Sequence, residues 1–249
     1  MTTIRDEMPE TRALLGVDVI DSASNEGYRL NALWVALDRM MHTALTDNGI
    51  PPGEVLNSEP GGDGGLYTLP GHRLGAMLDL TTRLDELAAT HNRFHKPEIK
   101  LRIAIELGAV GDETGYYAPK IRLNRLLNAG AFKALMERCL RERPDGSVNS
   151  GLIISRSAFH EAFGGAYTAT VHRHEFVEIE AAEKKFKEMA WVRVPGLDSR
   201  TLAEFASARA EATRARAETG KVVNQVFGAM NGVQAGDVHG DINFGTGPR

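Results

Sequence analysis

Two aspartates stand in positions that call for a chemical reason. Asp18 interrupts the apolar run ALLGVDVI at residues 13–20, a pattern typical of a buried strand. Asp63 lies within PGGDGG at residues 60–65, a composition typical of the turn of a β-hairpin. A buried carboxylate without a partner is costly, so we expect Asp18 to meet a hydrogen-bond donor, a metal ion or an exposed strand end.

The spacing of these two acids suggests that they act together. They are 45 residues apart, a length that a strand, a long helix and the first arm of a hairpin would use. If the hairpin pairs beside the first strand, both carboxylates lie at one edge of the sheet, as two-metal phosphoryl chemistry requires with ions about 4 Å apart. The surrounding glycines have two interpretations, because they suit a tight turn and also let a phosphate approach bare backbone.

Apolar periodicity predicts the elements that would position the acids. A long amphipathic helix follows the first strand and ends near residues 48–49, and short strands at 54–58 and 66–69 flank the glycine-rich turn. A second helix spans about 74–87, and alternating apolar residues at 101–107 predict a strand. Further helices are expected at about 120–128, 131–141 and 157–163, and strands at 152–155, 175–180 and 190–194.

This order of elements predicts an α+β fold of ferredoxin-like type, with a mixed sheet and helices packed on one face. We divide the chain into a disordered N-terminus (1–10), this domain (11–196), an exposed helical linker (197–224) and a tail (225–249). The linker is predicted because residues 199–218 are rich in Ala, Glu and Arg, with only Leu202 and Phe205 as large apolar residues.

Charge and composition exclude several classes of partner. The net charge of −4 gives no overall field that would recruit nucleic acid or an anionic membrane. No apolar run reaches the roughly 18 residues of a membrane span, and residues 1–10 do not resemble a signal peptide. The single cysteine, Cys139, lies in an apolar helical pattern and is expected to be a buried thiol. We therefore expect a cytoplasmic protein.

The two acids and the run LRIAIELGAV at 101–110 together resemble a class III nucleotide cyclase domain. The likeness is greatest to divergent cyclase-like domains of actinobacterial signalling proteins, and covers roughly residues 11–196. The segments that carry this second likeness are GGDGGLYTLP, THNRFHKPEIKLRIAIELGAVGD, RLLNAGAFKAL, GLIISRSAF and EMAWVRVPG. A diguanylate cyclase is less favoured, because Gly64-Gly65 stand where that signature has Glu-Phe.

The resemblance implies a two-metal site that uses Mg²⁺ or Mn²⁺. Asp18 and Asp63 match the two metal-binding acids, the Val19 carbonyl would be a further ligand, and Gly62 and Gly64 would lie against the nucleotide. In the family, one ion lowers the pKa of the ribose 3′-hydroxyl and the other holds the triphosphate, so that the oxygen attacks the α-phosphorus and pyrophosphate leaves.

The second half of the implied site matches less well. Arg125 matches the family arginine that stabilises developing charge, but Ile121 stands where the family has an Asn. Glu59 replaces the base-reading Lys, and Tyr117 replaces a glycine. Thr114 falls near the second base-reading position in a loose alignment.

Two functions remain open at this point. The first is a signalling enzyme that cyclises a nucleoside triphosphate, and the second is a catalytically inactive cyclase fold used as an interaction module. Family sites form between two chains, so activity implies a homodimer.

The C-terminal stretch NGVQAGDVHGDINFG at 231–245 resembles the amyloid signalling motifs of bacterial immune-type receptors and effectors, which are similar to the RIP homotypic interaction motif. Such β-prone segments stack in register as cross-β layers. The resemblance implies partners with similar motifs, and the alternative is a solvated glycine-rich terminus. The expected homotypic contacts are Val233, Gln234, Gly236, Val238, Ile242 and Phe244.

Overall fold

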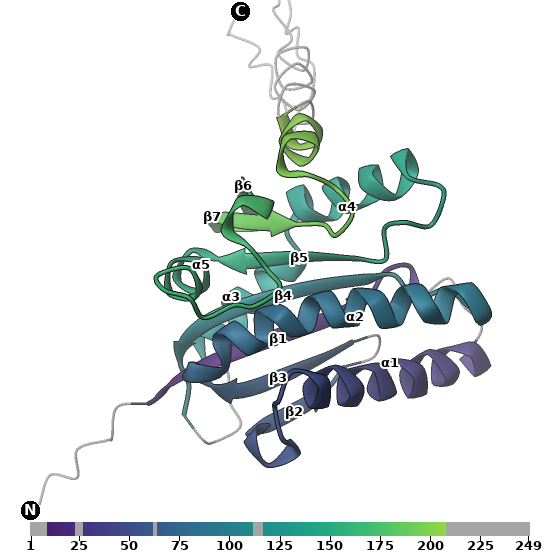
Figure 1. The fold of residues 1–249 in the computed structure, drawn as a ribbon. Coiled ribbons are helices and arrows are strands. Elements are labelled where there is room, and N and C mark those ends of the chain that lie inside the picture. The colour runs from purple at the N-terminus through teal and green to yellow at the C-terminus, as the bar shows by residue number, and fades with distance from the viewer. Residues whose placement is uncertain (1–8, 23–26, 62–63, 112–116, 208–249) are drawn as a thin grey trace, which may run out of the picture. The chain divides into compact units, whose positions relative to one another are not determined.

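The computed structural model describes residues 9–22, 27–61, 64–111 and 117–207. They build a seven-stranded sheet in the order β2-β3-β1-β4-β5-β7-β6 (Figure 1). The strands are β1 (Thr11–Val19), β2 (Asn57–Pro60), β3 (Gly64–Pro70), β4 (Leu101–Ala109), β5 (Ser150–Ser155), β6 (Val177–Glu183) and β7 (Phe186–Arg193).

The sheet is mixed, with β1 near its centre. β1 pairs antiparallel with both β3 and β4, whereas β4 and β5 run parallel. In this register Asp18 lies opposite Gly64 on one side and Arg102 on the other. The hairpin β2–β3 therefore pairs beside the first strand, as predicted.

Helices α1 (Gly27–Asp47) and α2 (Leu74–Phe94) lie side by side on one face of the sheet (Figure 1). Their apolar stripes enclose the larger core cluster with odd-numbered residues of β1, such as Leu15 and Val17. The expected α+β class, with a mixed sheet and helices packed on one face, is confirmed.

The structure adds a second helical layer on the opposite face. Helices α3 (Ala118–Leu127) and α4 (Gly130–Glu142) enclose a second cluster that includes Leu14 of β1 and Ala104 of β4. The free thiol of Cys139 is buried in this cluster, and burial raises its pKa to about 11. Even-numbered residues of β1 and β4 thus face α3 instead of water.

Short elements complete the chain. Helix α5 (Arg156–Ala162) follows β5, and 3₁₀ turns form at Pro52–Glu54, Gly71–Arg73 and Arg173–Glu175. The first hairpin arm begins at Asn57, later than the predicted residue 54, because Pro52–Glu54 form a 3₁₀ turn closed by a hydrogen bond from Val55 N to Pro52 O.

No helix in the described part of the chain is long and apolar enough to cross a membrane.

Residues 199–207 are helical, and their large apolar side chains contact the domain. Leu202 is fully buried in the second core cluster. The Phe205 ring lies 4.4 Å from the Arg138 guanidinium of α4, and Arg138 donates to the Phe205 carbonyl. Residues 208–249 lie outside the described part, and the predicted homotypic motif lies outside it with them.

Candidate functional site

Asp18 lies one residue before the end of β1, and its carboxylate is buried. The Arg102 guanidinium, from the opposing position on β4, donates to Asp18 Oδ2 and forms an ion pair with it. The structure therefore supplies a donor, one of the three solutions expected for this acid. A buried ion pair whose members are 84 residues apart in sequence depends on the correct pairing of β1 and β4.

Gly64 brings the hairpin backbone unusually close to β1. A Cβ added at Gly64 would lie 1.9 Å from the Val17 carbonyl oxygen and 3.0 Å from the Asp18 Cα, so no other residue fits there without a backbone shift. Gly61 N donates to Gly64 O at 2.8 Å and closes the hairpin end. Gly62 and Asp63 lie outside the described residues, but the chain neighbour of Asp63 is directly opposite Asp18.

Helix α3 contacts several strands on the face that carries Asp18. It packs on β1, β4, β5 and β6, and Leu123 lies 3.4 Å from the position of a Cβ on Gly16. Near the start of α3, the Lys120 ammonium lies 2.5 Å from Glu59 Oε1 of β2. The acid at the expected base-reading position is therefore neutralised by a lysine, a partner that the sequence analysis missed.

Arg125 lies toward another part of the sheet. Its guanidinium carbon is 5.7 Å from the ring centroid of Phe186 on β7. Ile121 is 37% exposed, and Tyr117 is the N-cap of α3. The predicted metal acid Asp18 and the predicted charge-stabilising Arg125 thus have different strands as partners, while Thr114 lies outside the described residues.

A buried polar cluster on the same face also escaped the sequence analysis. Glu106 of β4 is fully buried, and its Oε1 accepts hydrogen bonds from Arg122 at 3.2 Å and from Ser157 at 3.0 Å. Burial raises the pKa of Glu106, the Arg122 charge opposes this, and the nearby Glu188 carboxylate adds to it. The alternation at 101–107 indicated one buried face, whereas α3 buries the other face as well.

The described residues supply only part of a metal site. Among them, no group of three His, Cys, Asp or Glu side chains is placed to hold an ion. The predicted donors, which are the Asp18 carboxylate, the Val19 carbonyl and the Asp63 carboxylate, are hard oxygens of the kind that Mg²⁺ and Mn²⁺ prefer. The donor chemistry therefore fits a divalent ion, with the Arg102 guanidinium as a competing cation at Asp18.

Comparison with solved structures identifies the fold of the domain, whereas comparison with protein families and curated proteins finds no match. A structure of a bacterial light-regulated adenylyl cyclase aligns with 83% of this chain and 99% of that chain, at 9% identity and a TM-score of 0.50.

Two further structures align at lower scores. Another structure of a bacterial light-regulated adenylyl cyclase aligns with 82% of this chain at 9% identity and a TM-score of 0.49, and the aligned part is 58% of that longer chain. The guanylate cyclase domain of RhGC from Catenaria anguillulae, in complex with GTP, aligns with 76% of this chain and 98% of that domain, at 14% identity and a TM-score of 0.46. The alignment at a TM-score of 0.50 gives the domain a class III nucleotide cyclase-like fold, and at 9% identity the likeness concerns the fold alone.

Proposed function

We propose that the chain is a divergent class III cyclase-like signalling effector that cyclises a nucleoside triphosphate. One observation carries the proposal. The buried carboxylate of Asp18 lies directly across from Gly64, the chain neighbour of Asp63, where the hairpin backbone is too close to β1 for any side chain. This is the arrangement that a shared two-ion site at one sheet edge needs.

The proposal gives each group a role. Asp18, Asp63 and the Val19 carbonyl hold two Mg²⁺ or Mn²⁺ ions, and these ions supply charge neutralisation of the triphosphate and a lowered pKa of the ribose 3′-hydroxyl. Arg102 fixes the Asp18 carboxylate in place through its ion pair. Gly62 and Gly64 would lie against the nucleotide through their backbone, since the Val17 carbonyl fills the side-chain space at Gly64.

Arg125 enters the proposal through a second copy of the chain. Within one chain it lies against Phe186 of β7, whereas Asp18 lies on β1 with β3 and β4 as neighbours. A homodimer in which one copy supplies the acids and its partner supplies Arg125 would bring both to one triphosphate. The guanidinium would then stabilise the charge that develops as pyrophosphate leaves.

The Glu59–Lys120 pair bears on the base. A lysine at position 59 would be free to donate to a purine, whereas here the acid is already satisfied by Lys120 at 2.5 Å. We therefore expect little discrimination between adenine and guanine.

A non-catalytic interaction module is the second candidate, and specific observations favour it. The family Asn position carries an exposed isoleucine, Ile121, and the only described metal-binding side chain is already neutralised by Arg102. In this case the fold would serve assembly, through the C-terminal motif at 231–245, with partners that carry similar motifs.

The deciding experiment is Mn²⁺-supported turnover with ATP, GTP, CTP and UTP at high concentrations of the full chain, with products identified by mass spectrometry. Asp18→Asn should abolish product formation, because it removes a metal-binding charge with little change of shape. Glu178→Gln removes an equal charge from an exposed site on β6 and should leave turnover unchanged.

The outcomes separate the two candidates. A cyclic product from the wild type and from the Glu178 variant, but not from the Asp18 variant, supports the enzyme. Mn²⁺-dependent nucleotide binding without turnover supports the inactive module. If the chain shows no turnover and binds no nucleotide, a nucleotide site at Asp18 is ruled out.

A further inference from the structure

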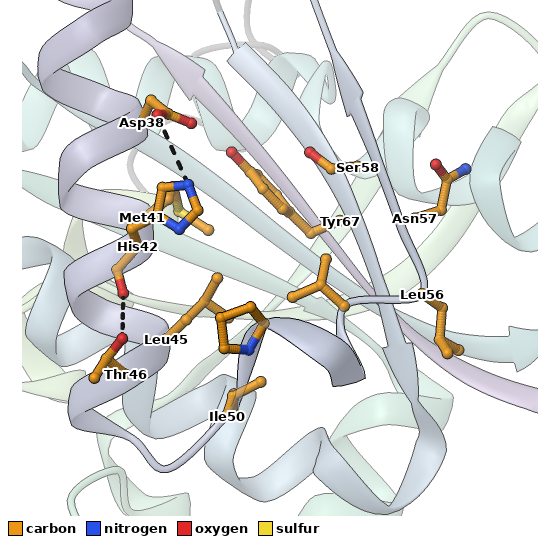
Figure 2. Close-up of a pocket in the computed structure, with 12 residues that line it drawn as sticks. Asp38, Met41, His42, Leu45, Thr46, Ile50, Leu56, Asn57, Ser58 and Tyr67 are labelled. Atoms are coloured by element: carbon orange, nitrogen blue, oxygen red, sulfur yellow. Dashed lines mark hydrogen bonds and ion pairs between the residues drawn. The ribbon is translucent and has the colours of Figure 1, made fainter.

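A pocket lies on the face of the sheet opposite to Asp18, between α1 and the β2–β3 hairpin (Figure 2). Its volume is about 450 Å³, within the roughly 300–1,000 Å³ range typical of small-molecule sites. We call it the α1–hairpin pocket; its lining residues are Asp38, Met41, His42, Leu45, Thr46, Ile50, Pro52, Val55, Leu56, Asn57, Ser58 and Tyr67.

The pocket has an apolar wall. Met41 and Leu45 of α1 and Ile50 after it are all buried members of the larger core cluster, and Val55 packs against that cluster. These side chains are held by the core behind them, so the wall exists before any ligand arrives. An aromatic or aliphatic group of modest size would gain dispersion contacts and lose water there.

One end of the pocket is polar. Figure 2 shows the Tyr67 ring extending from β3 toward α1, with its hydroxyl near Asp38 and Ser58. Burial raises the pKa of Tyr67, the Asp38 charge raises it further, and a hydrogen bond with Ser58 opposes the shift. The Tyr67 hydroxyl is therefore neutral at physiological pH, and Asp38 is the only acid among the described residues that line the pocket.

The charges of the lining residues favour a positively charged ligand over a negatively charged one. No lysine or arginine is among the described residues that line the pocket, so an anion would meet Asp38 without a permanent counter-charge from them. His42 is the only basic residue in this described lining, and its Nε2 lies 3.8 Å from the Asp38 carboxylate. A cation at Asp38 gains a charge-assisted contact, and the Tyr67 hydroxyl oxygen offers a second acceptor.

We propose that the α1–hairpin pocket binds a small amphipathic amine. The apolar body lies along Met41, Leu45 and Ile50, and the protonated ammonium donates to Asp38 and Tyr67. This site faces away from α3 and needs neither metal nor nucleotide, so it stands whether or not the domain turns over a triphosphate.

The test uses two probes with the same body and opposite charge, 4-phenylbutylamine and 4-phenylbutyrate. Isothermal titration of the full chain near pH 7.5, without metal or nucleotide, should give saturable one-to-one binding of the amine and clearly weaker binding of the carboxylate. Asp38→Asn should weaken amine binding about three- to tenfold, a modest loss because the Asp38 side chain is 66% exposed. Glu178→Gln, which removes the same charge elsewhere, should bind as the wild type does.

A second variant tests the location. Ser58 is exposed at the pocket, and Ser58→Trp should block entry of the amine while the melting temperature stays near that of the wild type. Equal binding of both probes, binding unchanged in the Asp38 or the Ser58 variant, or no saturable amine binding at millimolar concentrations would each overturn the proposal.

Discussion

Because Glu106 is buried, its protonation state affects the stability of the whole domain. It is fully buried on β4, and its Oε2 has no hydrogen-bond partner among the described residues. Its pKa is raised chiefly by burial, and the pKa of Glu188 nearby is raised for the same reason. The folded protein therefore holds these protons more tightly than the unfolded chain does. Stability from protonated Glu106 is present below the unfolded pKa of about 4.3 and is lost as pH rises toward the raised folded pKa.

Glu106→Gln should remove this loss, because the amide has nearly the same shape and cannot ionise. Urea unfolding measured between pH 4 and 8 should show a shallower decline of the free energy of unfolding with rising pH in this variant than in the wild type. Glu178→Gln, on the exposed edge strand, should follow the wild-type curve. Parallel curves for the wild type and the Glu106 variant would show that this carboxyl does not titrate differently on folding.

At the residue scale, the sequence predicted the burial of Asp18 but not the residues that pair with Asp18 and Glu59. The apolar run around Asp18 correctly indicated that this carboxylate is buried and needs compensation. Arg102 and Lys120 could not be assigned from sequence, since they meet Asp18 and Glu59 across 84 and 61 residues only after the sheet has formed. Asp63 stays a prediction.

The β2–β3 hairpin is the element on which the candidate site depends most. Its inner strand approaches β1 so closely at Gly64 that the Val17 carbonyl occupies the space of a side chain. Glycine at this position is therefore a packing requirement, in addition to any contact with phosphate.

Gly64→Ala should destabilise the domain by about 1–3 kcal/mol, because the strands must separate to admit a methyl group. Gly53→Ala is a matched control in the 3₁₀ turn before the hairpin, where an added Cβ meets nothing within 4 Å and the effect should stay within about 0.5 kcal/mol. Chemical denaturation of both variants measures the difference. A Gly64 variant as stable as the Gly53 variant would show that β1 and β3 can accommodate a methyl group without a loss of stability.

Element boundaries were predictable wherever apolar periodicity was long. The helix α1 and the strand β4 lie close to their expected ranges, because each carries many buried apolar residues. Helix α2 begins at the expected Leu74 but continues to Phe94, beyond the expected end near residue 87. The start of β2 was predicted wrongly, since two successive prolines, Pro51 and Pro52, lead into a turn that residue pattern alone did not separate from a strand.

On the scale of the whole molecule, the order of elements was enough to predict the fold class. It was not enough to predict that helices cover both faces of the sheet. Strand order and the placement of α3 on the second face depend on which long-range pairs form, such as Leu123 with Gly16. Leu202 and Phe205, the two large apolar residues of segment 199–218 in the expected linker, pack in or against the second core cluster.

The C-terminal motif is expected to act independently of this folded part. A peptide of residues 225–249 should assemble steeply with concentration and be seeded by similar motifs, because stacking supplies partners for every backbone amide. Gln234→Pro should block assembly by removing a ladder donor, and the same change in the full chain should leave the melting temperature of the domain unchanged. Thioflavin fluorescence and fibre imaging provide the measurement. A wild-type peptide that stays monomeric with and without seeds would refute the motif.

The pairing of Asp18 with Arg102 has a consequence for how the protein matures. Because Arg102 provides a counter-ion for this buried acid, we expect the domain to fold without a metal ion. If the proposed metal site is correct, a divalent ion would then bind to a domain that is already folded, and the concentration of the ion would set turnover without deciding whether the domain folds.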